Sequence, residues 1–358
     1  MTDIIVPSNV SVRDVDEWAD ALAVRQSLDL RVDQPFDGQL LSESRLVGLV
    51  AQARFLRRPL NLLLSERVAP DHFSKSSIAT VFGIVADRIT HADGTDVTDR
   101  VRYHLQAVAS LQNGIFGGNR SYLMPVVDGQ TALGGYRPFP HLTNVTSETF
   151  PTALERLLRS LVTVPSHFPW DFAAQFVFEI WQNTVEHGLN DLMGNLIDGL
   201  RCIVVRSALL GPSNVLGDDF SSEYLVALRD RFGDLLHELI EVSVCDSGIG
   251  IATRLSGNPN LREEPEQAQV SYLQQAMTVH GSSKKRRGSG LGYPKALRVL
   301  DKTRGLLLVN SGGIRAGKTY LPPFEPWPSP LLYSMTIARA GIARGTAVTL
   351  LLPVVSER

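Results

Sequence analysis

The second half of this chain contains four short apolar segments, each of a length that suits one buried β-strand. They cover residues 201–206, 239–245, 305–310 and 346–352. Helical patterns precede them over about 146–161 and 170–188. Helices and strands that alternate in this way predict a sheet covered by helices. We therefore assign residues 146–358 to one α/β domain within a protein of the α+β class.

The sequence pattern of residues 1–145 predicts a separate N-terminal α/β domain. A strand at 28–32, a helix over about 41–56 and a strand at 60–64 have the spacing of a strand–helix–strand unit with a parallel pair. Further helices are predicted at about 73–90 and 97–112, and one strand at 122–127. We find no catalytic constellation here, so we interpret this half as a scaffold or partner-recognition domain.

Composition excludes several classes of protein. The net charge of −2 gives no basic field that would indicate nucleic-acid binding. No apolar stretch reaches the ~18 residues of a membrane span, and the N-terminus lacks the pattern of a signal peptide. The only cysteines, Cys202 and Cys245, exclude a disulfide framework and a thiolate-rich zinc site. We expect a cytoplasmic protein that does not associate with membranes.

The first candidate motif is a polar stripe on the helix predicted at 170–188. Glu179, Asn183 and His187 are spaced four residues apart, so their side chains share one helix face. Phe176 and Ile180 belong to the apolar part of the same helix. Such a stripe is more often a solvated face than a site, and it gains weight only from the motifs that follow it.

The second candidate motif follows the strand at 239–245. The strand ends in Asp246, and Gly248 and Gly250 allow a sharp turn and a close approach to a ligand. A carboxylate at this place can accept a hydrogen bond from the exocyclic amine of adenine. The alternative is an ordinary Asp-Ser-Gly turn.

The third candidate motif is a glycine-rich loop that leads into a helical pattern. Its glycines are preceded by the basic run 284–287, and a helix N-terminus after such a loop presents backbone N–H groups to phosphates. The alternative is a flexible surface loop. The residues concerned are Lys284, Arg287, Gly288, Gly290, Leu291 and Gly292.

Taken in order, these three motifs resemble those of the GHKL ATPase superfamily. Residues 179–187 resemble its N box, residues 246–250 its first glycine box and residues 288–292 its second, while Gly345-Thr346 matches a late Gly-Thr pair. The resemblance covers about 146–358 and implies a histidine-kinase-like α/β sandwich, a mixed sheet with helices on one face. It implies the regulatory, anti-sigma-kinase-like branch rather than the gyrase, mismatch-repair or chaperone types. The unit at 28–64 also resembles a STAS-like domain.

The resemblance implies ATP and Mg²⁺ as cofactors and a role for each motif residue. Asn183 would bind Mg²⁺, Glu179 would be the catalytic residue that orients water or a phosphoryl acceptor, and Asp246 would bind the adenine amine. Thr346 would support Asp246 through a water, and His187 would belong either to the site or to helix packing. Gly248, Gly250 and the loop 288–292 would shape the path of the sugar and phosphates. Residues from about 252 to 287 would form a mobile lid from which Lys284 or Arg287 reaches the phosphates.

The implied activity is Mg²⁺-dependent ATP binding with slow hydrolysis, in which lid closure controls a partner protein in signalling. Two alternatives remain at this point: a serine or histidine protein kinase that phosphorylates a partner, and an ATP-sensing module that does not hydrolyse. The partner, the pathway and the oligomeric state, a homodimer included, are left open.

Two further patterns imitate other families. Residues 312–319 match the P-loop pattern GxxxxGK[ST], but a proline-rich segment follows instead of the helix that a P-loop needs. We predict a β-hairpin over 306–320, with Lys318 on its surface. His237-Glu238 imitates a histidine-kinase phospho-acceptor, but it leads into a core strand.

Overall fold

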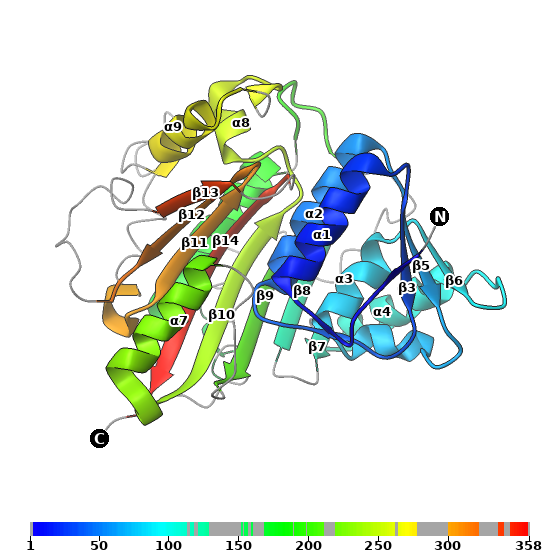
Figure 1. Ribbon diagram of the computed structural model, residues 1–358, viewed down its shortest axis with the longest axis horizontal. Coiled ribbons are helices and arrows are strands. Elements are labelled where there is room, and N and C mark those ends of the chain that lie inside the picture. The colour runs from blue at the N-terminus through cyan, green and yellow to red at the C-terminus, as the bar shows by residue number, and fades with distance from the viewer. Residues whose placement is uncertain are drawn as a thin grey trace.

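The computed structural model describes residues 3–112, 115–117, 121–128, 152, 154–156, 159, 168–188, 190–197, 199–210, 219–261, 264–277, 300–321, 336–339 and 344–356. They form a mixed α/β protein with a four-stranded sheet in the N-terminal half and an eight-stranded sheet beyond it (Figure 1). Within these ranges, no helix combines the length and the apolar character that crossing a membrane requires.

The N-terminal sheet is parallel throughout, with strand order β1-β3-β5-β6. The predicted parallel pair is confirmed, because β3 and β5 pair from Leu28↔Leu60 to Val32↔Leu64. Both strands alternate between buried and more exposed positions, so leucine and valine side chains from one face enter the core. The strands are β1 (Ile4–Ile5), β3 (Leu28–Val32), β5 (Leu60–Leu64) and β6 (Arg88–His91), and a short pair joins β2 (Asn9–Val10) to β4 (Asp37–Gly38).

Four helices accompany this sheet. They are α1 (Val12–Val24), α2 (Ser42–Leu56), α3 (Ser77–Val85) and α4 (Thr98–Gln112). Helix α1 begins at a reciprocal capping box, in which Ser11 and Asp14 bond each other's backbone N–H groups. The helix predicted over 73–90 is wrong in extent, because α3 ends at Val85. The β-branched residues Ile89 and Thr90 then pair with β5 as a fourth strand.

The larger sheet has the strand order β13-β12-β11-β14-β10-β9-β8-β7, and all neighbours are antiparallel. The four strands predicted from apolar segments and the hairpin at 306–320 are confirmed. The strands are β7 (Ile115–Gly117), β8 (Ser121–Asp128), β9 (Gly199–Leu209), β10 (Leu236–Asp246), β11 (Leu306–Ser311), β12 (Ile314–Thr319), β13 (Thr336–Arg339) and β14 (Thr346–Val355).

Two expectations about this sheet need correction. A mixed sheet was implied, but its described strands are antiparallel, because connections such as the one through α7 (Asp219–Phe232) return to the end of the sheet that they left. The boundary at residue 145 was also placed too late to separate the two sheets. Strands β7 and β8 precede it, yet β8 pairs with β9 over its whole length.

The larger sheet is covered on both faces, whereas helices on one face were expected. Strand β10 is buried at nine consecutive positions from Glu238 to Asp246, which requires cover on both sides. Even-numbered residues such as Val242 and Val244 pack in a cluster with α6 (Trp170–Asn183). On the opposite face, Cys245 joins the core that contains α2, and Leu239 packs with α7 (Figure 1).

A buried polar network joins α2 and its surroundings to the second face of the sheet. The Arg206 guanidinium of β9 donates to the Gly38 carbonyl, to the Glu43 carboxylate and to Ser77 Oγ, the last at 2.7 Å. The neighbouring Glu241 carboxylate accepts from the Leu41 N–H at 2.6 Å. Burial raises the pKa of Glu241 to about 7, helped by the nearby charge of Glu43. The two halves are therefore joined by charged groups as well as by apolar packing.

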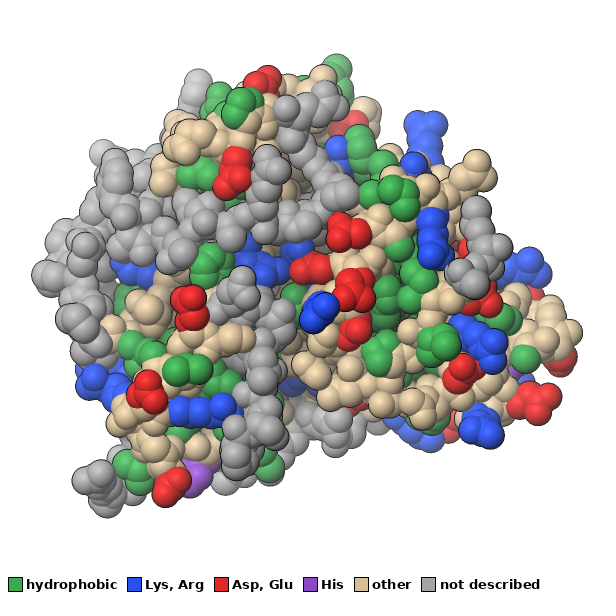
Figure 2. All heavy atoms as spheres, viewed as in Figure 1, with side chains coloured by type: hydrophobic (Ala, Val, Ile, Leu, Met, Phe, Trp, Pro, Cys, Tyr) green, Lys and Arg blue, Asp and Glu red, His purple; other side chains and the backbone are tan. Residues whose placement is uncertain are grey.

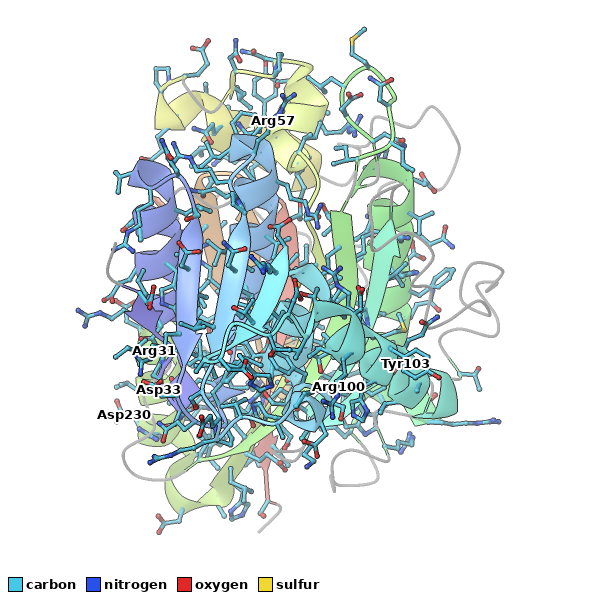
Figure 3. All side chains as sticks on the ribbon, turned by 90° about the vertical axis from the view of Figure 1, so that its right-hand side faces the viewer. Arg31, Asp33, Arg57, Arg100, Tyr103 and Asp230 are labelled. Carbon is cyan, nitrogen blue, oxygen red and sulfur yellow. The ribbon has the colours of Figure 1, made fainter. Side chains whose placement is uncertain are left out.

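The described surface carries both signs of charge. Figure 2 shows acidic and basic side chains interspersed over the described part of the face in view. Many belong to local pairs, such as Arg31 Nε with Asp33 Oδ1 at 2.7 Å. In Figure 3 this pair lies at the opposite end of the N-terminal half from Arg57. The free cysteines Cys202 and Cys245 are buried opposite each other on β9 and β10.

Candidate functional site

The predicted polar stripe lies on α6 and on the turn that follows it. Glu179, Asn183 and His187 are partly exposed, while Phe176 and Ile180 are buried against the sheet. Gln175 Nε2 donates to Glu179 Oε1 at 3.4 Å. After Asn183 the chain continues as a π turn over Thr184–Gly188, a feature that is frequent at functional sites. Helix α6 therefore presents the two predicted chemical groups, Glu179 and Asn183, one turn apart.

The end of β10 meets the end of this π turn. A Cβ atom added to Gly188 would lie 2.9 Å from the Asp246 Cγ, and one added to Gly248 would lie 2.7 Å from the Gly188 carbonyl oxygen. Only glycine fits such close approaches without displacing the neighbouring chain. The first two motifs, which are about sixty residues apart in the sequence, are thus brought into contact.

Asp246 is a buried carboxyl group at the end of its strand, with 6% of its surface exposed. The Gly248 N–H donates to Asp246 Oδ1 at 2.9 Å. Burial raises the pKa of Asp246 to about 6, although this hydrogen bond and the charges of Arg201 and Arg254 oppose the rise. The carboxyl is therefore mostly ionised at neutral pH, when it is able to accept hydrogen bonds.

Asp246 has a predicted neighbour on one side and an unpredicted one on the other. Thr346 of β14 lies directly opposite Asp246 in the strand register. Arg201 of β9 lies opposite it on the other side, and its guanidinium is 4.9 Å from the centre of the Trp181 ring. Sequence reasoning missed Arg201, because the first residue of an apolar strand gives no local signal of its partner.

Arg254 is a second residue that the sequence did not reveal. It lies on α8 (Ile251–Ser256), which begins after Gly250, a glycine with a φ of +89° that other residues rarely adopt. Its guanidinium donates to the backbone carbonyls of His187, Asn190 and Asp191. Arg254 therefore fixes the loop that follows α6. An arginine four residues after the second glycine could have suggested a structural role, but nothing local indicated its acceptors.

The predicted lid is described only in part. Its first section forms α8 and α9 (Glu266–Met277), and Val270 and Leu273 of α9 are buried in the same cluster as α6. The third motif and its basic run, Lys284, Arg287, Gly288, Gly290, Leu291 and Gly292, lie outside the described residues.

The described residues offer few ligands for a magnesium ion. Among the described residues, no group of three His, Cys, Asp or Glu could hold a metal. Asn183 supplies one oxygen of the type that Mg²⁺ prefers, and Mg²⁺ commonly keeps waters and binds substrate phosphates. An ion here would therefore depend on a phosphate ligand for its binding.

The P-loop match is a β-hairpin, as predicted. Residues 314–319 form β12, antiparallel to β11, with no helix directly after the lysine. The expectation that Lys318 is a surface residue is wrong. Only 9% of it is exposed, and its Nζ is 5.6 Å from the centre of the Tyr320 ring. His237-Glu238 lies within β10, also as predicted, with Glu238 buried beside Ser207.

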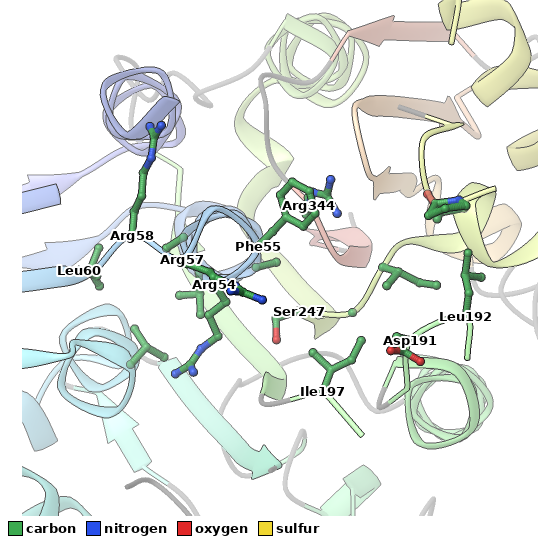
Figure 4. Close-up of a pocket in the computed structure, with 18 of the residues that line it drawn as sticks. Arg54, Phe55, Arg57, Arg58, Leu60, Asp191, Leu192, Ile197, Ser247 and Arg344 are labelled. Atoms are coloured by element: carbon green, nitrogen blue, oxygen red, sulfur yellow. The ribbon is translucent and has the colours of Figure 1, made fainter. Parts of the chain in front are cut away.

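A pocket of about 830 Å³ borders the turn that follows Asp246. Ser247 and Gly248 line it from the turn after β10, and Asp191 and Ile197 from the loop after α6. The end of α2 and the residues that follow it contribute Arg54, Phe55, Arg57 and Arg58 (Figure 4). Asp246 itself does not line this pocket. The pocket is thus next to the candidate adenine-binding carboxylate without including it.

Comparisons with protein-family models, with curated proteins and with solved structures gave no match to this chain.

Proposed function

We propose that this chain is a Mg²⁺-dependent, ATP-binding regulatory protein of the GHKL type, which hydrolyses ATP slowly and controls a partner protein through its nucleotide state. The observation that carries the proposal is that the π turn after α6 meets Asp246, which lies beside Thr346, at one end of the large sheet. These groups come from three separate segments, and each was expected to serve the same ligand.

The adenine specificity would come from Asp246. A buried carboxylate strongly favours a partner with N–H groups, since leaving it without one carries a desolvation cost. Adenine offers an exocyclic amine, whereas guanine has a carbonyl oxygen at that ring position. Two carbonyl-type oxygens facing each other repel, so this site would favour ATP over GTP.

The phosphate end of the ligand would lie along α6. Asn183 would give one oxygen to a magnesium ion, which would neutralise the phosphates when bound. Glu179, one helical turn earlier on α6, would accept a proton from a nucleophile or orient it. One earlier alternative was an ATP-sensing module that does not hydrolyse ATP. Such a module would give the Glu179 carboxylate no role.

The test of the proposal is calorimetric titration of ATP and GTP, with Mg²⁺, into the wild type and into Asp246→Asn. We expect ATP to bind more tightly than GTP, and the variant to lose about tenfold or more in ATP affinity, as for a lost charged hydrogen bond. Asp230→Asn is the control, since Asp230 is exposed on α7 (Figure 3). Equal affinity for the two nucleotides would contradict the proposal.

A second measurement separates hydrolysis from phosphoryl transfer. ATP labelled in its γ-phosphate is incubated with the protein alone and with candidate partner proteins. Release of labelled phosphate without a labelled protein supports the regulatory ATPase. A labelled partner that depends on Glu179 would instead identify a protein kinase.

A further inference from the structure

The pocket next to the Asp246 turn is a built cavity between the two halves of the chain. Its walls come from the end of α2, from the start of β5, from the loop 191–197 and from the segment 247–259. A volume of about 830 Å³ lies within the usual range of small-molecule sites, roughly 300–1,000 Å³. Gly248 of the second motif lines it, but Arg54, Phe55 and Met193 belong to none of the three motifs, so this part of the pocket needs its own explanation.

The charge of the pocket is predominantly positive. Arginines 54, 57, 58 and 344 line it, against two carboxylates, Asp87 and Asp191. Both carboxylates already accept backbone hydrogen bonds, Asp87 from the Leu60 N–H at 2.8 Å and Asp191 from the Met193 N–H at 2.8 Å. The lining therefore has more positive charge than its own acidic residues balance.

The four arginines differ in what they can offer a ligand. Arg58 donates to the Leu22 carbonyl, and in Figure 4 it points away from the pocket toward α1. Arg344 lies over the Phe55 ring. Arg54, in the last turn of α2, is favoured there by the helix dipole. The helix dipole does not explain Arg57, which follows the last residue of α2. Its φ of +51° is a backbone conformation that is unfavourable for a residue with a side chain.

Much of the remaining lining is apolar, and part of it is open to solvent. Phe55 is 56% exposed and Met193 is 85% exposed, and both line the pocket. Leu192 and Ile197 continue this apolar surface from the loop that Arg254 fixes. A large exposed aromatic side chain beside guanidinium groups is a combination that binds flat, apolar groups carrying negative charge.

We propose that this pocket is a binding site for a small organic anion with an aromatic or apolar body and a phosphate, carboxylate or sulfonate group. Arg54 and Arg57 bind the anionic group, because guanidinium forks match planar and tetrahedral oxyanions. Phe55, Met193 and Ile197 contact the body. This site does not require that the chain bind ATP, so it stands or falls on its own test.

The pocket is also linked to Asp246 through the next residue in the chain. Ser247, the next residue, lines the pocket, and its Oγ accepts the Leu200 N–H at 2.8 Å. A ligand that contacts Ser247 and Gly248 would change the freedom of the turn that positions the Asp246 carboxyl group. Only this effect on Asp246 rests on the proposed nucleotide site. If a pocket ligand changes the affinity for ATP, then ATP must change the affinity for the pocket ligand by the same factor.

The test uses 8-anilinonaphthalene-1-sulfonate, an aromatic anion, titrated into the full chain without nucleotide and followed by fluorescence and calorimetry. We expect one molecule to bind per chain, and Arg54→Gln and Arg57→Gln each to weaken binding about tenfold. Arg100→Gln, an exposed arginine on α4, is the matched control and should leave the affinity unchanged (Figure 3). The uncharged analogue N-phenyl-1-naphthylamine should bind at least about tenfold more weakly than the sulfonate.

Ile197→Trp gives a second, steric measurement, because a larger side chain at this partly exposed wall fills the pocket. Circular dichroism and the Tm establish that each variant is folded. Unchanged binding in the arginine variants and in Ile197→Trp would overturn the proposal, as would equal binding of the uncharged analogue. ATP is titrated last. A change in ATP affinity with the pocket filled shows coupling, and the same affinity refutes coupling while leaving the anion site intact.

Discussion

Asp246 is the residue whose protonation state should decide nucleotide binding. Its raised pKa, about 6, means that it becomes neutral under mildly acidic conditions. A protonated carboxyl is a weaker acceptor for the adenine amine, and ATP binding favours the ionised form. The affinity for ATP should therefore be full above about pH 7 and should fall as the pH drops through 6.

This prediction is measured by calorimetry between pH 5 and pH 8, with corrections for protonation of ATP itself. Asp246→Asn does not titrate and provides the baseline. If the wild type and the variant have parallel pH profiles, another group is responsible for the change.

Glu179 should separate binding from chemistry. The carboxylate is partly exposed on α6 and has no proposed role in adenine binding, so it should contribute little to the ground-state affinity. A residue that orients or activates a nucleophile typically supplies about 10²–10⁴ in rate. Glu179→Gln should retain ATP and lose most of its turnover in a phosphate-release assay. Wild-type turnover would mean that Glu179 is a solvated helix residue.

Lys318 and Asn183 distinguish the two candidate phosphate sites. Because Lys318 is buried on β12, Lys318→Ala should lower the Tm while ATP affinity stays close to that of the wild type. Asn183→Ala should do the opposite, since it removes an oxygen ligand from Mg²⁺ at little cost to packing. Titrations with and without Mg²⁺, beside thermal unfolding, measure both effects. If the two variants exchanged phenotypes, the lysine would be a phosphate ligand after all.

At the scale of elements, the site depends on how closely the end of the π turn after α6 approaches the end of β10. Gly188→Ala introduces a methyl group where the Asp246 Cγ already lies 2.9 Å away. Either the carboxyl or the π turn must shift, so ATP affinity should fall severalfold, although alanine suits a helix. Gly313→Ala is the control, because its methyl group meets only the end of the Gln269 side chain at 3.4 Å. An unchanged affinity in Gly188→Ala would argue against a site at this junction.

The arrangement of the elements also explains why helices were predicted on only one face of the large sheet, although both faces are covered. Sequence periodicity found each apolar strand, because two-residue alternation and apolar runs are local properties. It did not reveal that the second face of β9 and β10 would be filled by α2. That contact depends on a helix about two hundred residues earlier in the chain, as the bond from the Leu41 N–H to Glu241 shows.

At the scale of the molecule, Arg206 joins the two halves. Its guanidinium is buried with the Glu43 carboxylate, which is also fully buried. Removing one partner of a buried ion pair leaves the other charge uncompensated and costs about 3–5 kcal/mol. Arg206→Met should therefore lower the free energy of unfolding by this amount in denaturant titration.

Arg206→Met combined with Glu43→Gln should recover part of the loss, since no charge is then left unpaired between these two positions. Arg13→Met is the control, because Arg13 forms only an exposed pair with Glu17. A loss of less than about 1 kcal/mol in Arg206→Met would show that the halves do not depend on this network.

The sequence by itself determined the local structure and the candidate chemistry. The helix face with Glu179 and Asn183, the strand that ends at Asp246, and the hairpin around Lys318 all follow from patterns within about twenty residues. The tertiary structure alone decided which strands share a sheet, the partners of Arg201, Arg206 and Arg254, and the existence of the arginine-lined pocket. The physical reason is distance along the chain. These features need contacts between residues as far apart as Gly38 and Arg206, which are 168 positions apart, and a single sequence carries no local signal for such contacts.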